Sequence, residues 1–107
     1  KGEYFFLDQD SPHMLMAVKA KQEKKKNIEA TVHDDGSSRV QTVKKENNLK
    51  FYNLIQAFYD LTGVPVLLNT SFNIKGQPIV NTPKEAIDTL KNTNIDVLVM
   101  GDYILKK

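Results

Sequence analysis

Four small polar side chains lie within five consecutive positions of this chain: Asn69, Thr70, Ser71 and Asn73. They follow an apolar, β-prone run at residues 64–68 and precede a glycine at position 76. Hydroxyls, amides and the accessible backbone N–H groups beside short side chains suit a ligand with many acceptors, such as a phosphate. The pattern by itself favours residues that only satisfy the backbone of a turn, as Asn, Ser and Thr often do. An anion-binding loop is the alternative.

A fifth candidate, Arg39, opens the run RVQTV at residues 39–43. Alternation predicts a strand there, with Arg39 and Gln41 on one face and Val40 and Thr42 on the other. A guanidinium binds phosphate or carboxylate-like oxygens through two parallel hydrogen bonds, which a lysine cannot do. The residues alone favour a surface salt bridge for Arg39, and an anionic ligand is the alternative partner. No cluster with metal-ligand spacing accompanies it, so no metal site is predicted in this chain.

The elements that must position these residues can be read from periodicity. Apolar residues recur at helical spacing over 46–61, and Gly63 follows at the position of a C-terminal cap. A second helix begins at Thr82, with Pro83 and Glu85 completing a capping box. Strands are predicted at 14–18, 40–43 and 64–68, and Gly101-Asp102 predicts a closing hairpin. The fold class is therefore α/β (α+β), with helices packed on a mixed sheet.

In such sheets, ligands gather where strands end, which places the polar cluster at a predicted binding edge. The 107 residues make one domain by length, with a net charge of +2. The chain has no cysteine, which favours a reducing, cytoplasmic location, and no membrane partner is expected. Five of the eight residues at 19–26 are lysine. That run is interpreted as a solvated loop, and a phosphate-binding patch is the alternative.

Several blocks together resemble the O-carbamoyltransferases of the NodU/CmcH type. The stretch VPVLLNTSFNIKGQPIVNTPKEA at residues 64–86 is similar to that family's carboxyl-terminal signature, with Gln77 where the family usually has Glu. The blocks SPHMLMAV at 11–18 and TVHDDGSSRVQTV at 31–43, and the ending IDVLVMGDYIL, match in the same order. The resemblance spans nearly the whole chain.

The resemblance implies that residues 1–107 are the carboxyl-terminal part of a YrdC-like domain, one region of its open twisted sheet. Such a domain makes carbamoyl adenylate from carbamoyl phosphate and ATP, with Mg²⁺ as an optional companion of the nucleotide. A separate amino-terminal domain holds iron and the hydroxyl-bearing acceptor. Within TSFNIKGQP, Ser71 and Asn73 correspond to residues that contact the nucleotide phosphates, with Asn69 and Thr70 in support. Arg39 resembles the arginine that meets the carbamoyl or phosphoryl group.

Two departures from the family pattern bear on this interpretation. Phe72 and Lys75 replace small residues of the YrdC pattern, which alters the shape expected for the pocket. The family's basic block, which normally precedes the segment EYFFLDQDSPHML, does not occur in these residues. The chain alone is therefore expected to be inactive. The competing hypotheses are a non-catalytic nucleotide- or RNA-binding module and a structural half that docks on the missing domain, and nucleic acid is not an expected partner.

Overall fold

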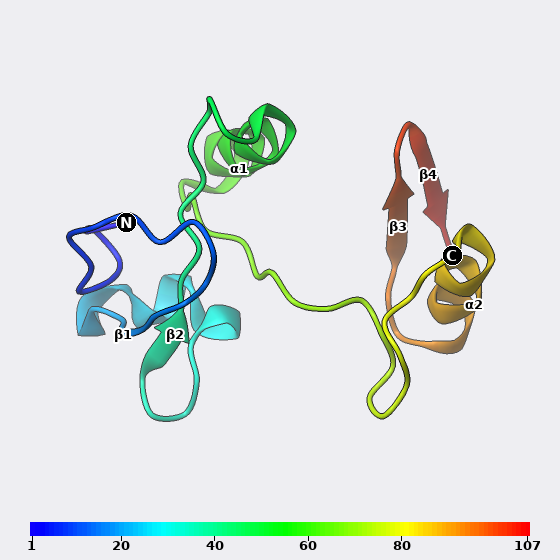
Figure 1. Ribbon diagram of the computed structural model, residues 1–107, viewed down its shortest axis with the longest axis horizontal. Coiled ribbons are helices and arrows are strands. Elements are labelled where there is room, and N and C mark those ends of the chain that lie inside the picture. Colours follow the sequence, from blue (N-terminus) through cyan, green and yellow to red (C-terminus); the bar gives the residue numbers. More distant parts are fainter. The chain divides into compact units, whose positions relative to one another are not determined.

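The computed structural model describes all residues, 1–107, and divides into two compact units, Lys1–Leu68 and Asn69–Lys107. Helices and strands occur together, so the predicted class is confirmed (Figure 1). The strands form two separate antiparallel pairs, β1–β2 and β3–β4, and not the single mixed sheet that was predicted. No helix of the chain is long and apolar enough to cross a membrane.

The first unit is built around a short strand pair and an aromatic core. β1 (Ala17–Lys19) pairs antiparallel with β2 (Ser37–Arg39), and Val18 lies opposite Ser38. Two 3₁₀ helices, η1 (Gln22–Asn27) and η2 (Glu29–Thr31), connect the two strands. The core of this unit consists of buried apolar side chains from its first 28 residues: Tyr4, Phe5, Leu7, Ala20 and Ile28.

Two of the predicted strands do not form. At residues 40–42 the backbone is held by Ser11: its carbonyl accepts from the Thr42 N–H at 2.8 Å, and its hydroxyl donates to the Val40 carbonyl at 2.9 Å. Such hydroxyl bonds compete with a strand ladder. Residues 64–68 are also irregular, because Pro65 lacks an N–H donor and no strand pairs with them. Val64 and Val66 nevertheless pack against the first core.

Helix α1 (Leu49–Thr62) ends as its sequence predicts and begins three residues later than expected. The Asn48 side chain caps it by accepting from the Phe51 N–H at 3.2 Å. Gly63 follows with φ 75°, a left-handed conformation that glycine adopts without steric cost. No residue of α1 is buried.

In the second unit, helix α2 (Pro83–Asn92) packs on a hairpin of β3 (Val97–Met100) and β4 (Tyr103–Lys106). The predicted capping box is present: the Thr82 Oγ1 accepts from the Glu85 N–H at 3.2 Å. The Glu85 carboxylate accepts from the Asn81 N–H at 2.8 Å, one residue before the cap. Ala86 and Leu90 meet Leu98 in the core. The predicted turn at Gly101-Asp102 connects the two strands.

Candidate functional site

Ser71 and Asn73, two of the predicted phosphate ligands, are in direct contact. The Ser71 hydroxyl donates to Asn73 Oδ1 at 2.7 Å. The Asn73 Nδ2 donates to the carbonyls of Ile74 and Gln77, each at 3.1 Å. The same segment is closed by the Gln77 N–H, which donates to the Ile74 carbonyl at 2.9 Å. Asn73 therefore holds a tight turn over residues 74–77.

The third position of that turn is Gly76, whose φ is 85°. This value is typical of a type II turn, which requires a positive φ at the third residue and therefore favours glycine. A second bond, from the Val80 N–H to the Phe72 carbonyl at 2.8 Å, joins the two ends of the loop that runs from 72 to 80. The turn itself therefore explains why a glycine occupies position 76.

These contacts decide which groups remain for a ligand. The amide hydrogens of Asn73 are both used in the turn, and the Ser71 hydroxyl hydrogen is directed at Asn73. Asn69 and Thr70 are exposed at the start of the loop. A phosphate at this loop would meet the Thr70 hydroxyl and backbone N–H groups first, and it would reach the Ser71 donor only by displacing Asn73. The assignment of these residues to a ligand stays a prediction.

Arg39 ends β2, opposite Ala17 of β1. Its side chain is exposed and takes part in none of the four salt bridges of the chain, so a role in an ion pair is not observed. Arg39 and Gln41 are exposed whereas Val40, Thr42 and Val43 are half-buried, so the predicted alternation holds up to Thr42 and fails at Val43. Arg39 belongs to the first unit and the polar loop to the second.

The lysine run forms the 3₁₀ helix η1 and its flanks, and is not the simple solvated loop that was predicted. Lys24 lies 3.2 Å from the Glu3 carboxylate and 5.3 Å from the centre of the Tyr4 ring. Lys21 lies 5.8 Å from the centre of the Phe6 ring. Lysine stems commonly cover apolar surface in this way while the charged head stays in water.

Two carboxylates of the first unit have lowered pKa values, and in both cases the cause is a neighbouring group of the same unit. Hydrogen bonds and ion pairs from Lys1 at 2.6 Å and Lys44 at 2.8 Å lower the pKa of Asp10 to about 2. Hydrogen bonds from the Ser37 hydroxyl and N–H lower the pKa of Asp35. Each carboxylate is thus satisfied by neighbouring groups of its own unit.

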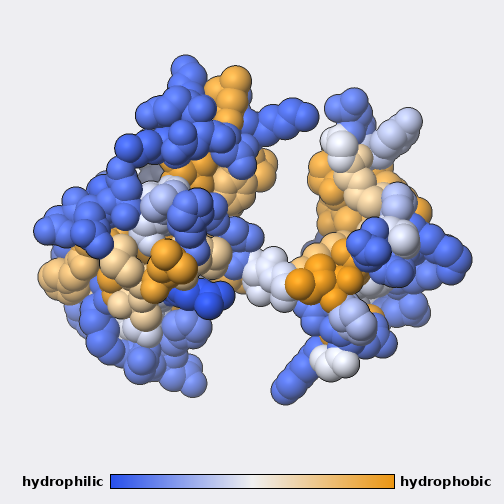
Figure 2. Space-filling view, viewed as in Figure 1, coloured by the Kyte–Doolittle hydropathy of each residue, from blue (hydrophilic) through white to orange (hydrophobic).

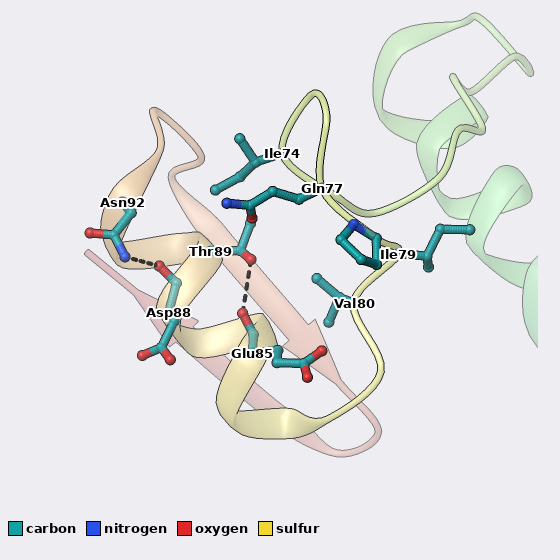
Figure 3. Close-up of a pocket in the computed structure, with 9 residues that line it drawn as sticks. Ile74, Gln77, Ile79, Val80, Glu85, Asp88, Thr89 and Asn92 are labelled. Carbon is teal, nitrogen blue, oxygen red and sulfur yellow. Dashed lines mark hydrogen bonds between the residues drawn. The ribbon is translucent and has the colours of Figure 1, made fainter.

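The second unit also contains an open pocket of about 330 Å³, which the sequence patterns did not predict (Figure 3). One wall is aliphatic and comes from the loop after Asn73: Ile74, Pro78, Ile79 and Val80. The other wall is a polar face of α2: Glu85, Asp88, Thr89 and Asn92. Gln77 completes the lining, and Figure 3 shows its side chain extending toward Thr89. The only sequence signal was the apolar run PIV at residues 78–80, which is separated from α2 by Asn81 and Thr82.

The chain belongs to the carbamoyltransferase C-terminus family, whose model matches residues 1–107. The relatives include enzymes with a stated reaction. The chain is 34% identical over 101 residues to the 3'-hydroxymethylcephem-O-carbamoyltransferase of Amycolatopsis lactamdurans, covering 94% of the chain and 19% of that enzyme.

Other relatives have names that state no reaction. The chain is 41% identical over 109 residues to the nodulation protein NolNO of Sinorhizobium fredii, covering 99% of the chain and 16% of that protein. An uncharacterized protein of Methanocaldococcus jannaschii is 42% identical over 105 residues, covering 98% of the chain and 20% of its own length. The chain therefore spans about one-fifth or less of the length of these relatives.

Proposed function

We propose that this chain is part of an O-carbamoyltransferase that activates carbamoyl phosphate with ATP and transfers the carbamoyl group to a hydroxyl of a small molecule. The observation that carries the proposal is the family match over the whole chain, together with relatives named as O-carbamoyltransferases. The proposal also draws on the resemblance of the loop TSFNIKGQP to adenylate-forming domains of the YrdC type. The location proposed is the cytoplasm.

The chemistry balances in two steps. With one water, carbamoyl phosphate and ATP give carbamoyl adenylate, phosphate and pyrophosphate, with a bond formed from a carbamate oxygen to the α-phosphorus. The acceptor hydroxyl then attacks the carbamoyl carbon, loses its proton, and AMP leaves as the carbamate ester forms. In the first step, negative charge moves onto the attacked α-phosphate and the leaving pyrophosphate. Fixed hydrogen-bond donors therefore have their largest effect on the rate of that step.

The proposed roles follow from the loop geometry. The turn held by Asn73 fixes the backbone beside Ser71 and Thr70, and a preorganised backbone stabilises developing charge without reorganising. Asn69, Thr70, Ser71 and Asn73 form the proposed phosphate loop, and Arg39 supplies the proposed guanidinium. Mg²⁺ would come with the nucleotide phosphates, because no group of three His, Cys, Asp or Glu residues in the chain is placed to hold a metal ion. Iron is proposed only for a separate amino-terminal domain.

A non-catalytic nucleotide- or RNA-binding module would use the lysines of the first unit. Lys24 is engaged with Glu3 and Tyr4, and Lys21 lies over Phe6. Tyr4 is buried, so of these two rings only Phe6, which is 68% exposed, can stack on a base, whereas single-strand binding uses aromatic side chains for successive bases. This observation favours the enzyme.

The test is ATP–pyrophosphate exchange by the full-length protein, beside a melting curve for each variant. Thr70→Val removes a hydroxyl that the turn does not use, so it should reduce the exchange rate without lowering the melting temperature. Asn73→Ala removes the bonds that hold the turn, so it should lower both the exchange rate and the melting temperature. The matched control is Asn94→Ala, an exposed asparagine of the same unit. Normal exchange in both loop variants would show that the cluster is only a turn.

A further inference from the structure

We propose that two buried serines, Ser11 and Ser38, are positioning residues, which fix the backbone on both sides of Arg39 and so hold its guanidinium in place for an anionic ligand. This inference rests on the proposed function, because that function assigns Arg39 to the carbamoyl or phosphoryl group. Neither serine is among the site residues that the sequence predicts.

Burial sets these two serines apart from the other polar residues. Only three polar side chains of the chain are buried, and two of them are those of Ser11 and Ser38, which are 3% and 4% exposed. A buried hydroxyl is costly unless it forms a hydrogen bond. The Ser38 Oγ donates to the Thr31 carbonyl at 2.7 Å, and the Ser11 Oγ donates to the Val40 carbonyl at 2.9 Å. The two bonds therefore anchor the residue directly before Arg39 and the residue directly after it.

Ser11 holds the segment after Arg39 through its backbone as well. Its N–H donates to Thr42 Oγ1 at 2.8 Å, and its carbonyl accepts from the Thr42 N–H at 2.8 Å. Because Pro12 follows, the backbone of Ser11 is restricted to extended conformations, which favour this pairing. Three bonds of one residue thus hold the chain immediately after β2 ends at Arg39.

The strand pair β1–β2 separates the anchors from the guanidinium (Figure 1). Ser38 lies opposite Val18, which packs against the core of the first unit. Neighbouring residues of a strand face opposite sides, so Arg39 and its partner Ala17 lie on the outer face, where both are exposed. A fixed backbone beneath an exposed arginine reduces the freedom that the arginine must lose when it binds a ligand.

The turn that follows Ser11 is strained. Met14 has φ 56°, a left-handed conformation that is unfavourable for a side chain of this kind. Such strain persists only where the surrounding structure fixes the backbone, and it is frequent at functional sites. Here the bonds of Ser11 fix the chain before the turn, and β1 fixes it afterwards. The segment that contains Ser11 is therefore constrained at both ends, as a positioning role requires.

The test is ATP–pyrophosphate exchange by the full-length protein, with a melting curve for each variant. Ser11→Ala and Ser38→Ala should each reduce the exchange rate by roughly 10-fold while the variant is still folded, because small displacements of a positioned group have large effects on rate. The KM for carbamoyl phosphate should rise more than the KM for ATP, since Arg39 is assigned to the former. Ser37→Ala is the matched control and should keep the rate within about twofold. Ser37 belongs to the same strand, but its hydroxyl bonds to Asp35 at 2.6 Å.

A double-mutant cycle with Arg39→Lys separates positioning from stability. Lysine keeps the positive charge but lacks the planar fork of arginine. If Ser11 acts through Arg39, Ser11→Ala should reduce the exchange rate much less in the Arg39→Lys background than in the unchanged protein, whereas it should lower the melting temperature equally in both. An equal loss of rate in both backgrounds, or equal losses in Ser11→Ala and Ser37→Ala, would overturn the inference.

Backbone order provides a measurement that does not depend on activity. In the 107-residue chain, NMR relaxation should show greater mobility at Arg39 and Val40 in Ser11→Ala, and no change there in Ser37→Ala. Exchange at the normal rate in Ser11→Ala would overturn the positioning role and leave the proposed function standing. No exchange by the unchanged protein would overturn the proposed function, and the relaxation data would still decide whether the serines fix Arg39.

Discussion

α1 is the longer of the two helices, with 14 residues against 10, and it carries more large apolar side chains than α2. Even so, α1 buries none of its residues, whereas α2 buries Ala86, Thr89 and Leu90. On α1, Leu54 is 57% and Leu61 is 86% exposed, and Figure 2 shows orange side chains on the surface of this helix. Apolar content alone therefore does not decide which helix is buried.

The difference lies in what each sequence places next to its helix. The hairpin that α2 packs on begins only five residues after α2 ends, so helix and partner form one local unit. Leu98 and Leu105 face each other across the hairpin and both contribute to that packing. The other face of the hairpin exposes Val97, Val99 and Ile104. The second unit thus has one finished core and one apolar face that stays exposed.

The largest expected effect comes from truncating the core on which α2 packs. Leu98→Ala should lower the free energy of unfolding of the second unit by about 2–4 kcal/mol, because Leu98 is 7% exposed and its loss leaves a cavity. Leu54→Ala on α1 should change stability by no more than about 0.5 kcal/mol. Urea unfolding of the 107-residue chain, followed by NMR signals of each unit, measures both. Val99→Ala is the matched control on the same strand, since Val99 is 62% exposed. Similar losses in Leu98→Ala and Leu54→Ala would mean that α1 is buried in solution.

An intermediate effect is expected from the N-terminal caps. Each of the two helices has its own capping side chain. Thr82→Ala should destabilise the second unit by about 1 kcal/mol, because the Glu85 N–H loses its acceptor. Asn48→Ala removes the corresponding bond to Phe51, but it should reduce the helicity of α1 without lowering the stability of the second unit. Circular dichroism and amide exchange of each helix provide the measurements. Thr82→Ser keeps the cap and serves as the control.

The smallest effect concerns the acid sensitivity of the first unit. The pKa of Asp10 is lowered from 3.8 to about 2 by Lys1 and Lys44, so its carboxylate binds its proton less readily in the folded state. Its contribution to stability is therefore full above pH 3.8 and is lost as the pH falls toward 2. Asp10→Asn should remove this pH dependence between those values, measured as the unfolding midpoint of the first unit. Lys44→Met should remove part of it, and an unchanged acid profile in both variants would contradict the assignment.

The loop at residues 69–80 shows how far sequence reasoning reached at the site. The residue types marked a segment of polar side chains before a glycine, and the structure shows Ser71 and Asn73 in contact there, whereas their binding of an anion stays a prediction. The bonds of Asn73 to Ile74 and Gln77 were not predictable in detail, because they depend on the backbone course of the turn. The pocket was missed for a similar reason, since its two walls come from a loop and a helix that meet only in the folded unit.

The sequence by itself determined the features that depend on neighbouring residues. The capping box at Thr82, the glycine cap at Gly63 and the hairpin turn at Gly101-Asp102 all appear as predicted. Each is fixed by hydrogen bonds or backbone angles within about four residues, so local chemistry is sufficient. The family could also be recognised from the sequence, since its motifs are contiguous.

Only the tertiary structure decided how the first unit is held together. Ser11 bonds to Val40 and Thr42, which lie 29 and 31 residues away, and these bonds replace the strand predicted at 40–43. Tyr4, Phe5 and Leu7 form the core with Ala20 and Ile28, although no periodic pattern marks them. Contacts between residues far apart in the chain depend on which partners the fold brings together. A single sequence cannot specify those partners by spacing, whereas burial and hydrogen bonding in the folded unit select them.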